Sequence, residues 1–166
     1  MPEKKTIERA REDAREGKSP STQAGEFVRE EIHHIREGKH GARSTQQAIA
    51  IGLSKARRAG VKLKTPKKGT VSEETRRAAA RDTRKAKSGG RKKTSARRSR
   101  AMLKRLKREG RSAASPQALA KQARSAARRR SAASRSASAK KAARTKGPAK
   151  RRAAAKKAAR TRARRR

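Results

Sequence analysis

Apolar residues recur at helical spacing in two stretches near the N-terminus. In residues 21–37, the apolar side chains on one face are Ala24, Val28, Ile32 and Ile35, with Phe27 beside them. In residues 44–59 the stripe consists of Ile49, Leu53 and Ala56, and Ile51 widens it. Glycines follow both stretches at Gly38 and Gly60, where helices commonly end. The pattern predicts two helices joined by a short turn, as a hairpin that holds the main hydrophobic core.

Capping signals predict further helices with far fewer apolar residues. Ser44 and Gln47 form an S-x-x-Q capping box before the second hairpin helix. Helices are also predicted at residues 3–16, 72–87 and 95–109, and Ser88-Gly89-Gly90 is expected to be a linker. Their apolar residues are sparse, so we expect weak tertiary packing for these helices.

Composition limits the size of the core. Hydrophobic residues make up 30% of the 166 residues, charged residues make up 40%, and the chain has one Phe and no Trp or Tyr. Residues 111–166 consist almost entirely of Ala, Arg, Lys and Ser, which predicts a tail that is disordered when free. Phosphate neutralisation could induce helix there, because Ala and Arg favour helices, and Gly147-Pro148 would interrupt it. The predicted fold class is all-α: a small helical hairpin, further short helices and a long disordered basic tail.

Positive charge increases along the chain. Residues 1–43 hold ten Lys and Arg against nine Asp and Glu (+1), residues 44–87 hold 13 against three (+10), and residues 88–166 hold 31 against one (+30). The expected segments are a charged helix at 1–20, the hairpin at 21–64, a basic helical neck at 65–110 and a polycationic tail at 111–166. A net charge of +41 far exceeds what solubility requires, which indicates a polyanionic partner.

Several classes of function are disfavoured. Without Cys, thiolate catalysis and Cys-ligated metals are excluded, and no motif or buried carboxylate setting for catalysis is evident. We therefore expect no enzyme activity and no cofactor. His33, His34 and His40 lie near several Glu residues, and ion pairs on the helix surface are favoured over a metal site. No apolar stretch has the length of a signal peptide core or a membrane span, which predicts no membrane partner and a cytoplasmic, nucleoid location.

Two short motifs suggest DNA contacts. Ala48-x-x-x-Gly52-Leu53-Ser54 resembles the core of bacterial helix-turn-helix repressors, but the capping signals place residues 45–59 in one continuous helix. Thr65-Pro66-Lys67-Lys68 resembles the unit of histone H1 tails in which a Pro-fixed turn presents two cations to the minor groove.

The tail carries the strongest signal for nucleic-acid binding. Its cations can neutralise phosphates and release counterions, whereas the lack of aromatics in the tail disfavours stacking of single-stranded bases. The candidate contact residues are Arg57, Arg58, Lys62, Lys64, Lys67, Lys68, Arg128, Arg129, Arg130, Lys140, Lys141, Lys150, Arg151, Arg152, Lys156, Lys157, Arg164, Arg165 and Arg166.

Two family resemblances follow from these residues. Residues 72–166, which end in AAAKKAARTRARRR, resemble the Lys/Ala/Arg-rich tails of histone H1 and of bacterial histone H1-like proteins. That resemblance implies DNA compaction and, in some bacteria, polyphosphate binding. Residues 21–63, especially STQQAIAIGLSKARRAGVKL, resemble small basic bacterial proteins that form a domain of unknown function.

These observations predict non-specific binding and compaction of duplex DNA, with RNA or polyphosphate as other polyanions. One alternative is an RNA- or ribosome-associated basic protein. Another is an adaptor whose hairpin binds a protein partner or a second copy of the chain.

Overall fold

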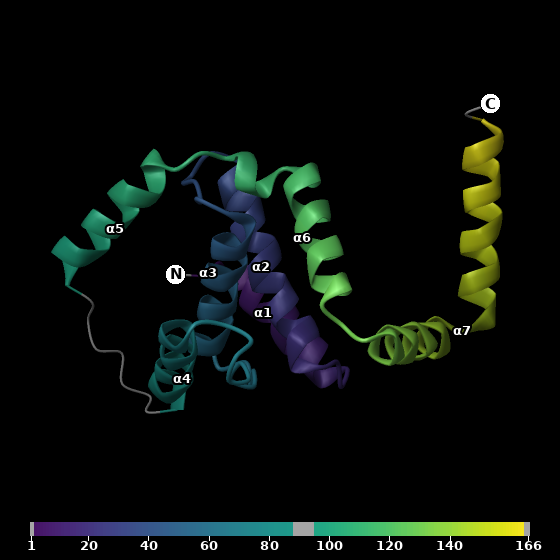
Figure 1. Cartoon of the computed structure of the whole chain (residues 1–166), viewed down its shortest axis with the longest axis horizontal. Coiled ribbons are helices and arrows are strands. Elements are labelled where there is room, and N and C mark those ends of the chain that lie inside the picture. Colours follow the sequence, from purple (N-terminus) through teal and green to yellow (C-terminus); the bar gives the residue numbers. More distant parts are fainter. Residues whose placement is uncertain (1, 88–94, 165–166) are drawn as a thin grey trace. The chain divides into compact units, whose positions relative to one another are not determined.

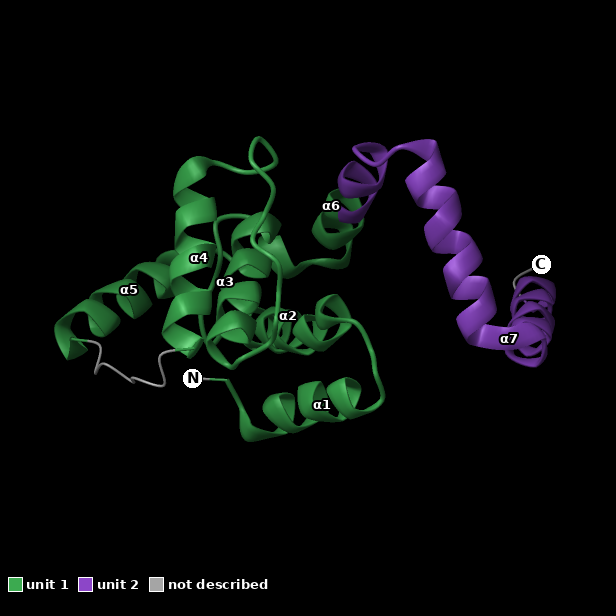
Figure 2. Ribbon diagram, turned by 90° about the horizontal axis from the view of Figure 1, so that it is seen from below, with its two compact units in different colours: residues 1–122 green, residues 123–166 purple. Residues whose placement is uncertain are grey.

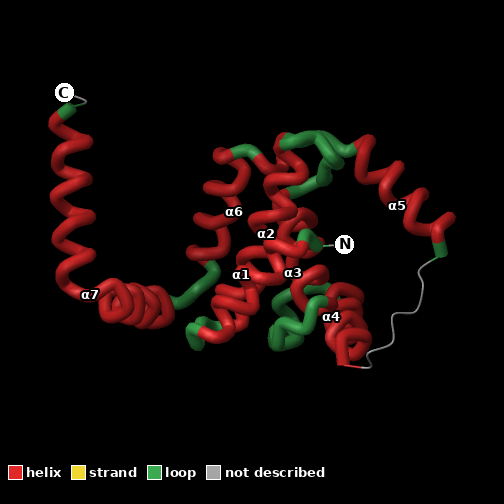
Figure 3. The backbone as a smooth tube through the Cα atoms, turned by 180° about the vertical axis from the view of Figure 1, so that it is seen from behind, coloured by secondary structure: helices red, strands yellow, loops and turns green. Residues whose placement is uncertain are grey.

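The computed structural model describes residues 2–87 and 95–164, which are entirely helical or loop, with no strand (Figures 1 and 3). The predicted linker at 88–90 lies outside these residues. The α-helices are α1 (Lys4–Arg15), α2 (Pro20–Arg36), α3 (Thr45–Arg58), α4 (Glu73–Lys87), α5 (Ala96–Arg108), α6 (Pro116–Arg128) and α7 (Ala132–Ala163), with a short 3-10 helix, η1, at Ser112–Ala114. Two compact units divide the chain, residues 1–122 and residues 123–166 (Figure 2).

Helices α2 and α3 form the hairpin at the centre of the first unit (Figure 1). The backbones approach closely at Gly52, where a Cβ atom would lie only 2.7 Å from the Cα atom of Val28. Ser44 caps α3, because its Oγ accepts a hydrogen bond from the amide of Gln47 at 3.1 Å, and the predicted cap is confirmed. The small residues of the A-x-x-x-G segment therefore serve to pack the hairpin.

The hairpin buries two separate hydrophobic clusters. The first contains Ala10, Ala24, Phe27 and Ala56, and it joins α1 to the hairpin. The second contains Ile32, Ile35, Ala42, Ala48, Ala113 and Ala114. Both clusters are small and rich in alanine, as the composition of the chain requires.

Residues 106–114 dock onto the hairpin, although they are far from it in sequence. The amide of Gly41 donates to the carbonyl of Leu106 at 2.9 Å, and the amide of Ala42 donates to the carbonyl of Gly110 at 3.1 Å. The hydroxyl of Thr45 donates to the carbonyl of Ala113 at 2.7 Å. Because Ala113 and Ala114 are buried, the predicted disorder is wrong from the beginning of that segment.

Helix α4 attaches to α3 through polar contacts centred on Asp82. Ser54 donates to its Oδ2 atom at 2.5 Å, and the Arg58 Nε atom lies 3.3 Å from Oδ1. Helix α5 has no buried residue, and Met102 and Leu103 are exposed. The apolar face of α4 consists of alanine and that of α5 is narrow, so both helices bury little surface.

The C-terminal part of the chain is helical, so the prediction of a disordered tail is wrong. Helix α7 spans 32 residues, and Ser131 caps it by accepting a hydrogen bond from the amide of Ser134. A helix satisfies its backbone hydrogen bonds locally, so a composition that excludes a core does not exclude a helix, and Ala, Arg and Lys favour one. The predicted interruption at Gly147-Pro148 is confirmed, because Gly147 has φ of 68° and ψ of 167° within α7. None of the helices in the described residues combines the length and apolarity needed to cross a bilayer.

Candidate nucleic-acid interface

Exposed cations dominate the described residues after the first four helices. Residues 95–164 contain 26 Lys and Arg residues, all exposed, and one acid, Glu109. No residue in this range forms an ion pair with another described residue. Their charge is therefore available to an external polyanion instead of being neutralised within the chain.

Helix α7 has cations around its whole circumference. Its 32 residues include 12 Lys and Arg and no acid. At 100° per residue, Lys150, Arg151 and Arg152 already point to three different sides of the helix, and the remaining cations fill the other directions. The kink at Gly147 separates two helical stretches, 132–146 and 148–163. Each stretch is about 22–24 Å long at 1.5 Å per residue.

Arg128, which ends α6, and Arg129 and Arg130, which follow it, differ in their contacts. Arg128 and Arg129 are exposed, and neither has a side-chain hydrogen bond to another described residue. The guanidinium of Arg130 donates to the carbonyl and hydroxyl of Ser134, at 3.0 and 3.1 Å, and also contacts the hydroxyl of Ser138. Arg130 therefore helps to fix the first turns of α7 while it remains exposed.

The other predicted tail residues lie on α7 or at its end. Lys140, Lys141, Lys150, Arg151, Arg152, Lys156, Lys157 and Arg164 are all exposed. Arg165 and Arg166 lie outside the described residues.

The predicted cations at the end of the hairpin differ in their exposure and in their contacts. Arg57 is only 8% exposed, and burial lowers its pKa while Asp82 acts in the opposite direction. Arg58 is exposed but paired with Asp82 and hydrogen-bonded to Ser54. The four remaining residues, Lys62, Lys64, Lys67 and Lys68, are exposed on the loop before α4. The structure therefore leaves the loop lysines, and not Arg57, accessible to a ligand.

No second helix of a helix-turn-helix follows Ser54. Helix α3 continues without a break to Arg58, which confirms the prediction of one helix. Ala48 and Gly52 are buried against α2, so this segment anchors the hairpin instead of reading bases.

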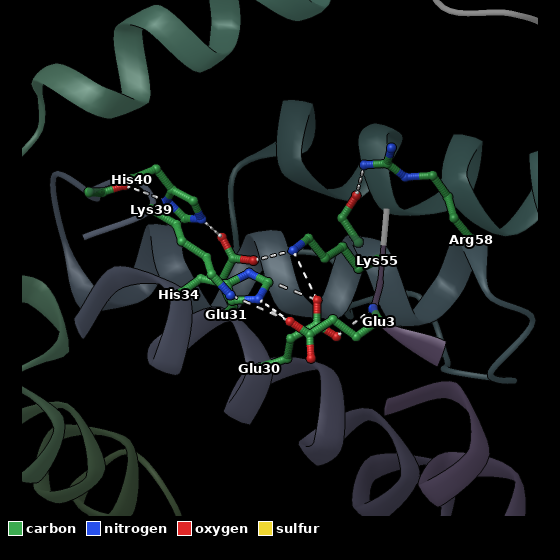
Figure 4. A network of polar contacts seen from close by, with 10 residues as sticks. Glu3, Glu30, Glu31, His34, Lys39, His40, Lys55 and Arg58 are labelled. Atoms are coloured by element: carbon green, nitrogen blue, oxygen red, sulfur yellow. Dashed lines mark hydrogen bonds and ion pairs between the residues drawn. The ribbon is translucent and has the colours of Figure 1, made fainter. Parts of the chain in front are cut away.

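The sequence analysis expected the histidines to form ion pairs with Glu residues on the helix surface, and it missed that His34 and His40 belong to a buried polar network in the hairpin (Figure 4). Glu31 is 0% exposed and Glu30 is 6% exposed, and the ammonium of Lys55 on α3 lies 2.6 Å from Glu31 Oε2 and 3.5 Å from Glu30 Oε1. His40 and His34 contact the same carboxylates, with His40 Nε2 3.2 Å from Glu31 Oε1 and His34 Nδ1 4.0 Å from Glu30 Oε1. A signal was present, because Glu31 lies midway between Phe27 and Ile35 at four-residue spacing, on the apolar stripe of α2.

The fold thus defines an all-helical protein with a small hairpin core and an excess of exposed cations. Residues 16–69, which cover α2, α3 and the loop beyond them, match the model of a family of unknown function (DUF6496). This match agrees with the resemblance of residues 21–63 to an uncharacterised domain. No curated protein and no solved structure matches the chain.

Proposed function

We propose that this protein binds duplex DNA without sequence preference and compacts it by phosphate neutralisation, as a histone H1-like protein of the bacterial nucleoid. One observation supports this above the others: 26 exposed Lys and Arg residues between 95 and 164, with a single acid among them. Each phosphate that a cation neutralises releases a counterion, and this entropy gain favours binding to any sequence.

The distribution of charge on α7 favours compaction over binding to a single duplex. Cations on one face of a straight helix can contact the phosphates of one duplex. The cations of α7 project in all directions, so those on the far side remain free for a second duplex. The helix therefore acts as a short cationic bridge, and bridging brings separate DNA segments together.

The position of the aromatic residue favours duplex over single-stranded nucleic acid. Sequence-tolerant binding of single strands uses aromatic side chains on which bases stack. The single aromatic residue, Phe27, is 1% exposed and belongs to the hairpin core. Contacts to the phosphate backbone remain as the main source of affinity, and a duplex offers them at the highest density.

The accessible candidates for these contacts are the exposed Lys and Arg residues of α6 and α7 and the four loop lysines of the first unit. Arg57 does not belong to this group because it is buried. The proposed location is the nucleoid.

The test measures DNA affinity against salt for the full chain and for a variant with the 12 cations of α7 replaced by Gln. Gln has nearly the helix propensity of Lys and Arg, so the helix is retained while its charge is removed. We expect a log–log slope steeper than about −5 for the full chain, which corresponds to about six phosphates, and a decrease of at least half in the variant.

A matched control replaces only the lysines of α7 by Arg, which keeps the charge and should leave the slope unchanged. A slope near zero for the full chain would refute the electrostatic mechanism. Competition between duplex DNA and structured RNA at equal phosphate concentration provides a second check. If RNA wins, the protein is RNA-associated and the nucleoid assignment fails.

A further inference from the structure

We propose that Glu31, His34 and His40 bind a divalent transition-metal ion of the zinc class. Their potential ligand atoms all lie within 4.8 Å of one another (Figure 4). Glu31 and His34 are three residues apart on α2 and so share one side of that helix. The turn after α2 brings His40 back over the same side, where it contacts Glu31.

Glu31 provides a buried carboxylate that the protein satisfies only in part. Neither of its oxygen atoms has a hydrogen-bond partner within the described residues, although Lys55 Nζ lies 2.6 Å from Oε2 and His40 Nε2 lies 3.2 Å from Oε1. These contacts have the distances of ion pairs without the angles of hydrogen bonds. A buried charge of this kind is costly unless cations compensate it. A metal ion at Oε1 would complete that compensation and leave Oε2 with Lys55.

The hydrogen bond on the other side of the His40 ring fixes which nitrogen can act as a ligand. Nδ1 lies 3.1 Å from the carbonyl oxygen of Gly41, which can only accept, so Nδ1 is the donor of this hydrogen bond. Nε2 then presents a lone pair to Glu31 Oε1. Two electron-rich atoms 3.2 Å apart require a positive charge between them, either a proton or a metal ion.

His34 has the same arrangement as His40, with the roles of the two ring nitrogens exchanged. Its Nε2 atom lies 2.8 Å from Oε1 of Glu3. The ionised carboxylate only accepts hydrogen bonds, so Nε2 carries the proton and Nδ1 keeps its lone pair. Metal-bound histidines in proteins characteristically donate their second nitrogen to a carboxylate or a backbone carbonyl, as His34 and His40 do here.

The charge and the donor set favour a zinc-class ion. The carboxylates of Glu3, Glu30, Glu31 and Glu37 exceed the two ammonium groups that pair with them, Lys39 and Lys55, by two negative charges. Two imidazoles and one carboxylate suit zinc and related transition metals, whereas magnesium and calcium prefer oxygen ligands alone.

The three ligand atoms must move closer together to bind a zinc ion. Ligand atoms around a tetrahedral zinc lie about 3.4 Å apart, so a pair at the 4.8 Å limit must approach by about 1.4 Å.

Zinc titration of the full chain against a chromophoric chelator tests this site. We expect one equivalent of zinc to bind and the thermal unfolding temperature to rise with zinc concentration. His34→Ala and His40→Ala should each weaken binding by at least about tenfold. His33→Ala is the matched control, because His33 is exposed on the same helix and its removal should leave zinc affinity unchanged.

Two results would overturn the proposal. One is the absence of zinc binding to the full chain, which would mean that a second proton on His40 satisfies Glu31. The other is equal weakening by His33→Ala, which would indicate chelation by surface histidines. Glu31→Gln retains the shape of the buried side chain, and circular dichroism verifies its fold. Cobalt should give a visible d–d spectrum with the full chain that is lost in folded Glu31→Gln, and persistence of that spectrum would also refute the site.

Discussion

Replacing Gly52 by Ala tests whether the hairpin depends on a close approach between two helices. A Cβ atom at position 52 would lie 2.7 Å from Val28 Cα and 3.0 Å from both its N and Cγ2 atoms. Two of these three atoms belong to the backbone of α2, so no rotamer change can relieve the contact. To reach an ordinary separation of about 3.4–4 Å, α2 and α3 must move apart by roughly 0.7 Å or more.

Two opposing effects set the change in the free energy of unfolding that Gly52→Ala causes. Overpacking of this kind costs about 1–3 kcal/mol, whereas Gly to Ala within a helix gains up to about 1 kcal/mol. The net loss should be about 1–2 kcal/mol, which corresponds to a decrease of about 4–8 °C in the unfolding temperature of a unit of this size. The assay is thermal unfolding of the full chain, followed by circular dichroism.

Gly25→Ala provides the control. Gly25 also lies inside a helix, α2, but a Cβ there would meet nothing within 4 Å. We expect this variant to gain about 0.5–1 kcal/mol from helix propensity alone. If Gly52→Ala raises the unfolding temperature as Gly25→Ala does, the close approach does not limit the hairpin and the reasoning fails.

Two further predictions concern contacts between distant segments. Gly41→Ala should undock residues 106–114, because the added Cβ atom would meet the backbone carbonyl of Glu109. Hydrogen exchange at the Ala42 amide, which donates to Gly110, should then accelerate strongly. Gly110→Ala is the control: its Cβ atom would meet only a side-chain atom at 3.9 Å, so the Ala42 amide should stay protected. Unchanged exchange in Gly41→Ala would contradict the docking. Contact with His34 and Lys39 lowers the pKa of Glu3 below its ordinary value of 4.5. The contact therefore stabilises the folded protein above pH 4.5, and this stabilisation is lost as the pH falls through the lowered pKa. Glu3→Gln should therefore lower the unfolding temperature at neutral pH and have little effect once the pH is well below the lowered pKa of Glu3. An equal loss in both conditions would contradict this assignment.

Most helix boundaries of the first unit could be predicted because their signals are local. The capping hydroxyl of Ser44, the glycine after each helix and the apolar stripe of the hairpin act within a few residues. The hydrophobic periodicity also identified the pairing of α2 with α3, since neither stripe can be buried without a partner.

The tail shows where reasoning from composition failed. Low hydrophobicity correctly indicated that residues 123–164 have no core, and the structure describes no buried residue there. The error was to equate the lack of a core with the lack of a helix. Local backbone hydrogen bonds, the Ser131 cap and the helix propensity of Ala, Arg and Lys act without tertiary contacts.

The sequence by itself determined helices α1 to α5, the hairpin stripe and the strong positive charge, because each depends on neighbouring residues or on a sum over the chain. Only the tertiary structure decided that Arg57 is buried, that Glu31 faces His40 and Lys55, and that residues 106–114 close over the hairpin turn. Those outcomes depend on which backbone approaches each side chain from distant parts of the chain. Spacing along the sequence placed Glu31 on the apolar stripe of α2, but it did not show which side chains of α3 and of the turn would reach that carboxylate.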